Sequence, residues 1–166
     1  MEYRSSSPDA RQYDGLAVRI YPSRQAMGAA AAEDIAAEMR RRLGLQPTVR
    51  MVFAAAPSQN EMLAALCQAP GLDWARVEAF HMDEYIGLNG ASEQLFSKYL
   101  ERRLFSRVRF RNVHLIDGNA NPRIEAERYA ALITEAPLDI ICLGIGENGH
   151  IAFNDPPVAD FNDPRI

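Results

Sequence analysis

The feature that most constrains the fold is a regular alternation of short apolar segments and longer helical segments. Short β-branched or apolar runs are typical of strands, and apolar residues at every third or fourth position are typical of helices. Strands are expected at residues 16–21, 48–55, 77–82, 113–116 and 138–143, and helices at 23–43, 58–67, 92–105 and 122–134. This alternation predicts an α/β fold with a doubly wound, mainly parallel, Rossmann-like sheet and helices on both faces.

Capping signals mark two of these helices. Ser23 stands where it can cap the first helix, and Gly44 stands where that helix should end. Ser58 and Glu61 form the S-x-x-E pattern of a capping box at the second helix. A capping box accounts for that segment without any ligand.

In a parallel sheet, ligands bind at the carboxyl ends of the strands, so polar or Gly-rich clusters there are candidate sites. The first cluster, residues 54–61, follows the second expected strand. Its small side chains let the backbone approach a ligand, and the helix start offers N–H groups to a phosphate. The residues expected to bind substrate here are Ala55, Ala56, Pro57, Ser58 and Gln59.

The second cluster contains the adjacent carboxylates of Asp83 and Glu84, directly after the third expected strand, and Glu84 is expected to contact the substrate. In a cleft, burial and mutual repulsion tune the pKa of such a pair, and one carboxylate could move a proton on a substrate carbon. The alternative is that both residues cap or solvate the next turn.

The third cluster follows residues 138–143, the most apolar strand and the one expected to be most buried. It contains Gly144, Gly146, Asn148, Gly149, His150 and Asp155. The glycines allow a tight turn and close approach to a ligand, so Gly146 and Gly149 are expected at the substrate. His150 can shuttle protons near neutral pH, and Asn148 and Asp155 can orient its ring. The glycine spacing does not fit a dinucleotide fingerprint, and no cofactor is expected.

Composition excludes several classes of function. The net charge of −4 argues against a nucleic-acid partner. No apolar run approaches the roughly 18 residues of a membrane span, and residues 1–14 lack the apolar region of a signal peptide, so a cytoplasmic protein without membrane contact is expected. Cys67 and Cys142 lack a CxxC spacing, so free thiols and no metal site are expected.

The expected organisation is a flexible segment at residues 1–15 and a single α/β domain at 16–166. The last segment, residues 156–166, is loop-like and ends on Arg165-Ile166, which looks like the entry to another strand. A sheet that stopped there would keep an uncovered edge. We therefore expect the domain to lack its C-terminal part.

Residues 82–88 (MDEYIGL) and 143–156 (LGIGENGHIAFNDP) resemble the two signature segments of glucosamine-6-phosphate deaminases. The resemblance implies a metal-free aldose–ketose isomerisation that expels ammonia from glucosamine 6-phosphate and leaves fructose 6-phosphate. It implies that Asp83 is the base that moves a proton between C2 and C1, that His150 opens the ring, and that Asp155 supports His150. It also implies a phosphate-binding role for residues 54–60 and is compatible with a homo-oligomer.

Three departures from the family pattern leave the sugar phosphate open. Asn148 replaces an aspartate, the first cluster reads AAAPSQN where Gly-Gly-Thr/Ser is usual, and no phosphate-binding lysine is found, since Lys98 is expected on the outer face of a helix. These changes suggest a divergent subgroup that acts on a related amino-sugar phosphate.

Two alternatives remain. A 6-phosphogluconolactonase resembles this fold but would carry an arginine after Asp-Glu, where this chain has Tyr85, and a GHTAS-type segment, where it has GHIAF. A sugar-phosphate sensor would lose its acid/base residues and keep its phosphate-binding loop. This chain shows the reverse, because it retains Asp83 and His150 while its first cluster is unusual.

Overall fold

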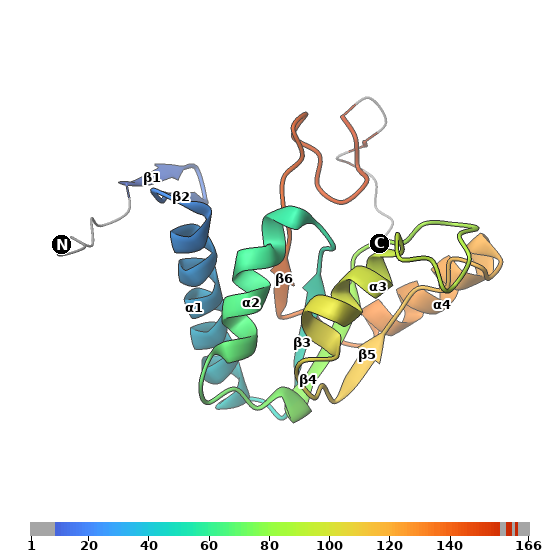
Figure 1. The fold of residues 1–166 in the computed structure, drawn as a ribbon, viewed down its shortest axis with the longest axis horizontal. Helices are drawn as coiled ribbons and strands as arrows, with labels where there is room; N and C mark the ends of the chain where they lie inside the picture. Colours follow the sequence, from blue (N-terminus) through green and yellow to red (C-terminus); the bar gives the residue numbers. More distant parts are fainter. Residues whose placement is uncertain (1–8, 157–158, 161, 163–166) are drawn as a thin grey trace.

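The computed structural model describes residues 9–156, 159, 160 and 162. Its centre is a four-stranded parallel sheet with the order β5-β4-β3-β6. The strands are β3 (Val49–Phe53), β4 (Val77–His81), β5 (Asn112–His114) and β6 (Ile140–Cys142). The helices are α1 (Arg24–Leu43), α2 (Asn60–Gln68), α3 (Phe96–Leu100) and α4 (Pro122–Thr134), with short helical segments η1 (Pro57–Gln59), η2 (Trp74–Arg76) and the π-helical η3 (Glu101–Phe105) (Figure 1).

Helices cover both faces of the sheet, as the alternation predicts. On one face, Met51 and Phe53 of β3 belong to a buried cluster with residues of α1, α2 and α3. On the other face, Val52 and Phe80 pack against Tyr129 of α4. Each fully buried side chain of this size contributes roughly 1.5–3 kcal/mol. Successive side chains of β3 therefore point into two different buried clusters. This fixes the register of the strand and, with it, the position of the loop that follows.

The prediction for the first expected strand was wrong in its pairing. Strand β2 (Leu16–Ile20) pairs antiparallel with β1 (Asp9–Tyr13) in a separate two-stranded sheet beside the start of α1. The segment expected to be flexible, residues 1–15, thus contains a strand, while residues 1–8 lie outside the described residues. All five residues of β1 are exposed, so no burial pattern marked it in the sequence.

The prediction that residues 138–143 form the most buried strand was also wrong. Strand β6 lies at an edge of the sheet, and Ile141 is 51% exposed. An apolar run shows which residues favour burial but not how many neighbours a strand has.

The predicted caps of the first helix are confirmed. The Ser23 hydroxyl accepts a hydrogen bond from the Ala26 N–H at 3.1 Å, and the Gly44 N–H donates to the Arg40 carbonyl at 3.1 Å. Within the described residues, no helix has the length and apolar composition of a membrane span.

Candidate functional site

Three loops meet at the carboxyl edge of the sheet. Because β3 lies between β4 and β6, the loop after β3 lies between the loops after those two strands. They enclose a pocket of about 230 Å³, which Phe96 of α3 also lines. The lining comprises Ala54, Ala55, Ala56, Ser58, Met82, Asp83, Phe96, Gly144, Ile145, Gly146, His150, Ala152 and Phe153. The structure thus brings together residues from all three clusters that the sequence indicated.

The loop after β3 does not form the predicted capping box. Among the described residues, neither η1 nor α2 receives a side-chain cap at its start. The Ser58 hydroxyl instead accepts a hydrogen bond from the Gln59 amide at 3.1 Å, and Glu61 forms an ion pair with Arg24 at 2.9 Å. The hydroxyl of Ser58 therefore lies at the pocket without serving the helix.

Two side chains hold this loop from behind. The Tyr99 hydroxyl donates to the Ala56 carbonyl at 2.8 Å, and the Arg24 guanidinium donates to the Pro57 carbonyl at 2.7 Å. Both donors lie outside the pocket lining, as do Pro57 and the buried Gln59, two of the predicted substrate contacts. The pocket therefore receives the small side chains of the loop and Ser58.

Asp83 lies two residues beyond the end of β4 and lines the pocket, half-buried. Burial raises the pKa of Asp83, and the negative charge of Glu84 raises it further. A carboxylate in this state is a stronger base than an exposed one, which suits the removal of a proton from carbon.

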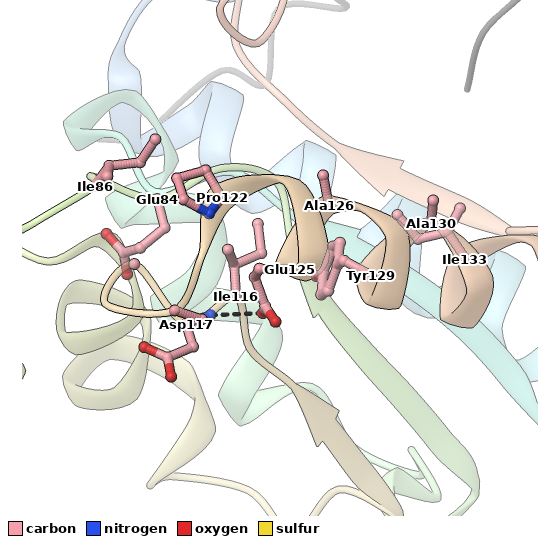
Figure 2. A pocket seen from close by; sticks show the side chains of 12 residues that line it. Glu84, Ile86, Ile116, Asp117, Pro122, Glu125, Ala126, Tyr129, Ala130 and Ile133 are labelled. Atoms are coloured by element: carbon pink, nitrogen blue, oxygen red, sulfur yellow. Dashed lines mark hydrogen bonds between the residues drawn. The ribbon is translucent and has the colours of Figure 1, made fainter.

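Glu84 does not lie in the pocket, contrary to the predicted substrate contact. Its carboxylate accepts hydrogen bonds from the backbone N–H groups of Tyr85, Phe96 and Ser97, each at 2.9 Å. Figure 2 shows Glu84 at the rim of a different hollow of about 340 Å³, which extends along α4 past Tyr129. Neighbouring carboxylates in the sequence thus serve different parts of the structure.

The third loop fixes the orientation and tautomer of His150. The Asn148 amide Nδ2 donates to Asp155 Oδ1 at 2.7 Å, so its Oδ1 is left to face His150 Nδ1, also at 2.7 Å. An amide oxygen only accepts, so Nδ1 carries the proton and Nε2 has the free lone pair. Asp155 Oδ1 lies 3.2 Å from His150 Nδ1 and supplies the negative charge that Asn148 lacks.

Two glycines of this loop are needed where they stand. A Cβ atom on Gly146 would lie 2.2 Å from the His150 ring, and Gly149 has a positive φ of 86°. The Gly149 N–H donates to the Gly146 carbonyl at 3.0 Å and closes the turn. Gly149, Asn148 and Asp155 lie outside the pocket lining and support His150 from behind.

Sequence reasoning missed the aromatic side of the pocket. Phe96 and Phe153 line it with their ring centroids 6.1 Å apart, and the Tyr85 ring packs against Phe96 in a tilted arrangement with a centroid distance of 4.6 Å. Phe153 lies within the third cluster, but Phe96 sits in an unremarkable amphipathic segment. No local pattern indicated that Phe96 would reach the site.

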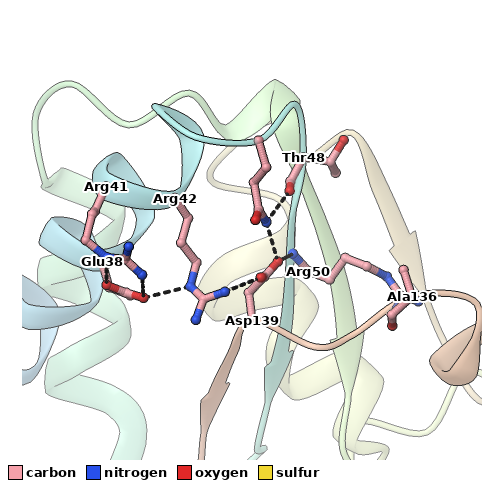
Figure 3. Close-up of polar contacts among 8 residues, drawn as sticks. Glu38, Arg41, Arg42, Thr48, Arg50, Ala136 and Asp139 are labelled. Atoms are coloured by element: carbon pink, nitrogen blue, oxygen red, sulfur yellow. Dashed lines mark hydrogen bonds and ion pairs between the residues drawn. The ribbon is translucent and has the colours of Figure 1, made fainter.

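A polar cluster at the opposite end of the sheet has a structural role (Figure 3). The Asp139 carboxylate accepts hydrogen bonds from Arg42, from the Gln46 side chain at 3.0 Å and from the Arg50 N–H at 2.8 Å. These contacts tie α1 and β3 to the start of β6. In the part of the chain that the structure describes, no group of three or more His, Cys, Asp or Glu side chains is arranged to hold a metal ion.

Comparison with known proteins identifies the family of the chain. Residues 22–154 match the model of the family of glucosamine-6-phosphate isomerases and 6-phosphogluconolactonases, and the chain belongs to that family. It is 35% identical over 136 residues to glucosamine-6-phosphate deaminase of Staphylococcus epidermidis, a match that covers 77% of this chain and 56% of that protein.

Solved structures give the same result. A monomeric glucosamine-6-phosphate deaminase aligns with a TM-score of 0.71 and 25% identity, over 81% of this chain and 57% of its own. The 6-phosphogluconolactonase of Thermotoga maritima aligns with a TM-score of 0.69 and 25% identity, over 76% of this chain and 59% of its own. The chain therefore spans little more than half the length of these relatives.

Proposed function

We propose that this chain carries the acid/base groups of an enzyme that isomerises and deaminates an amino-sugar 6-phosphate. The observation that carries the proposal is the shared pocket of Asp83 and His150, a carboxylate of raised pKa and an imidazole of fixed tautomer. The similarity to glucosamine-6-phosphate deaminases supports the same reaction.

In this proposal the substrate phosphate binds at the loop after β3. The backbone of Ala55 and Ala56 and the Ser58 hydroxyl form this subsite. Tyr99 and Arg24, which lie outside the pocket lining, bind the carbonyl oxygens of Ala56 and Pro57, so these oxygens already have hydrogen-bond partners. The sugar ring then extends toward Asp83 and His150, with its apolar face against Phe96 and Phe153.

His150 first opens the pyranose ring. Its unprotonated Nε2 accepts the proton of the C1 hydroxyl and returns it to the ring oxygen, which breaks the C1–O5 bond. The imidazolium that forms is stabilised by Asp155, 3.2 Å from Nδ1.

Asp83 then moves a proton between carbons. Its carboxylate removes the proton from C2 and delivers it to C1, while one proton of the amino group is lost and O1 gains one, which converts the open-chain amino-aldose into a ketimine with a C1 hydroxyl group. Water adds to the C2=N bond, and ammonia leaves as the ketose 6-phosphate forms. The same carboxyl group must accept a proton at C2 and then donate it at C1. The raised pKa of Asp83 favours this double role.

A 6-phosphogluconolactonase is the second candidate. An imidazole with an unprotonated Nε2 and a carboxylate near Nδ1, as His150 has with Asp155, can also activate water for attack on a lactone. The structural similarity to lactonases supports this candidate. In that reaction no carbon-bound proton moves, so Asp83 would not be needed as a base.

The test is turnover of a panel of amino-sugar 6-phosphates and of 6-phosphogluconolactone by the wild type, Asp83→Asn and Asp73→Asn. Asp73 is exposed and lies outside the pocket, so its variant removes the same charge elsewhere. We expect ammonia and ketose from the wild type and Asp73→Asn, and none from Asp83→Asn. Lactone hydrolysis that persists in Asp83→Asn, without ammonia release by the wild type, would favour the lactonase.

A further inference from the structure

The Glu84 carboxylate accepts three hydrogen bonds from backbone N–H groups. Its Oε1 accepts from the N–H groups of Tyr85 and Phe96, and its Oε2 accepts from Ser97. Phe96 and Ser97 are the first residues of α3, whose N-cap residue Leu95 has no side chain that could bind them. Since free N–H groups at a helix start need acceptors, Glu84 acts as the cap of α3 from 12 residues earlier in the chain.

Both ends of this connection reach the pocket. Asp83 directly precedes Glu84 in the chain, and Phe96 donates its backbone N–H to the Glu84 carboxylate; Asp83 and Phe96 both line the pocket. The Tyr85 ring also packs on Phe96, at a centroid distance of 4.6 Å. The cap therefore joins the loop that carries Asp83 to the helix that carries the aromatic side of the site.

The turn after Glu84 is held from its other side as well. The Gly87 N–H donates to the Gly118 carbonyl at 2.8 Å, and a Cβ on Gly118 would lie 2.1 Å from the Tyr85 carbonyl oxygen. The turn is thus fixed between α3 and the loop after β5, and the Glu84 carboxylate is its link to α3.

We propose that Glu84 is a positioning residue, whose carboxylate holds Asp83 and Phe96 in place relative to each other across the pocket. Its kinetic consequences rest on the proposed function. A carboxylate is required because three donors meet it: the amide of a glutamine would present an N–H to one of them, and an aspartate is one methylene shorter.

Glu84 also affects Asp83 through its charge. Burial disfavours ionisation of Glu84, but the hydrogen bonds from Ser97, Tyr85 and Phe96 outweigh it and lower its pKa, so Glu84 is negative at neutral pH. Asp83 shares its surroundings with this charge and with His150 in the pocket. Removing the Glu84 charge should therefore let Asp83 ionise at a lower pH, an effect that a purely structural cap would not have.

The experiment compares Glu84→Gln, Glu84→Asp and the control Glu93→Gln in the protein. Glu93 is an exposed carboxylate in the segment before α3, where it pairs with Arg102. We expect Glu84→Gln to lower kcat about tenfold to a hundredfold, since small misplacements of a reacting group have effects of this order. The acid limb of the pH–rate profile of Glu84→Gln should lie at a lower pH than that of the wild type. Glu84→Asp should lose kcat but keep the acid limb, and Glu93→Gln should match the wild type.

A second measurement does not depend on turnover. The Asp83 carboxyl carbon is titrated by NMR in the wild type and in both Glu84 variants. A lower midpoint in Glu84→Gln and an unchanged one in Glu84→Asp support the inference even if the protein turns over no amino-sugar phosphate, in which case the proposed function alone fails. Wild-type kcat in both Glu84 variants, or an Asp83 midpoint that Glu84→Gln does not move, would overturn it.

Discussion

His81 should make the stability of this protein fall on mild acidification. The side chain lies at the end of β4, is 1% exposed, and its Nε2 accepts a hydrogen bond from the Ile116 N–H at 2.7 Å. Burial lowers the pKa of His81 to about 4, with a smaller opposing effect from the charge of Glu84. The folded protein therefore holds a neutral imidazole, and a protonated ring would lose both its solvation and this hydrogen bond.

The sign and size follow from the two pKa values. In the unfolded chain the pKa is 6.5, so between 6.5 and about 4 the unfolded state binds a proton that the folded state does not. Stability is complete above 6.5 and is lost as the pH falls toward about 4. One pKa unit corresponds to about 1.4 kcal/mol, so the free energy of unfolding should fall by on the order of 3 kcal/mol across the interval between the two pKa values. Between about pH 7 and pH 4.5 the fall should be about 2 kcal/mol.

Urea unfolding at those two pH values measures this loss. The single tryptophan, Trp74, packs against Phe110 at 4.9 Å and serves as the fluorescent probe. His81→Gln retains an acceptor for Ile116 but does not titrate, so its stability should fall by about 2 kcal/mol less than that of the wild type. Asp83, whose raised pKa acts in the opposite direction, is present in both proteins and cancels. An equal loss in both proteins would refute the reasoning.

Three further predictions concern the site and the core. Asn148→Asp should move the acid limb of kcat/KM to higher pH, because a carboxylate at the position 2.7 Å from His150 Nδ1 favours the protonated ring; an unmoved limb would contradict the assigned contact. Gly146→Ala should lower kcat about a hundredfold with an unchanged circular dichroism spectrum, because its Cβ would displace the His150 ring. Asp139→Ala should lower the free energy of unfolding by about 2 kcal/mol in urea titrations, because it removes the side-chain acceptor of the Arg50 N–H and one of the two carboxylate partners of the partly buried Arg42.

The architecture of the sheet could be predicted from the sequence because apolar periodicity directly reports which residues are buried. Met51 and Val52 of β3 both had to be buried, on opposite faces, and this requires helices on both sides. The pairing of the strands, by contrast, could not be predicted from periodicity. The sequence of β2 looks like a strand of the main sheet, but its partner is the exposed β1. Edge position and partner depend on contacts between distant segments, which local periodicity does not contain.

The same limit explains the site. Asp83 and His150 were predicted together because both follow strands, and the parallel topology brings strand ends to one edge. Glu84 was misplaced because its partners are the N–H groups of Phe96 and Ser97, whose free donors arise only once α3 has formed. Phe96 was missed for the same reason. Side chains that act at strand ends are visible in the sequence, whereas those placed by helix packing are not.

The central claim is that Asp83 moves a proton between two substrate carbons, and deuterium transfer tests it most directly. Glucosamine 6-phosphate that carries deuterium at C2 is incubated with the wild type and Asp83→Asn in H₂O, and NMR follows ketose formation, ammonia release and the label at C1. We expect equimolar ammonia and ketose with deuterium carried from C2 to C1 by the wild type, and neither product nor transferred label from Asp83→Asn. Product and label formed at the same rate by Asp83→Asn, or lactone hydrolysis as the wild type's reaction with no transfer to C1, would contradict the account.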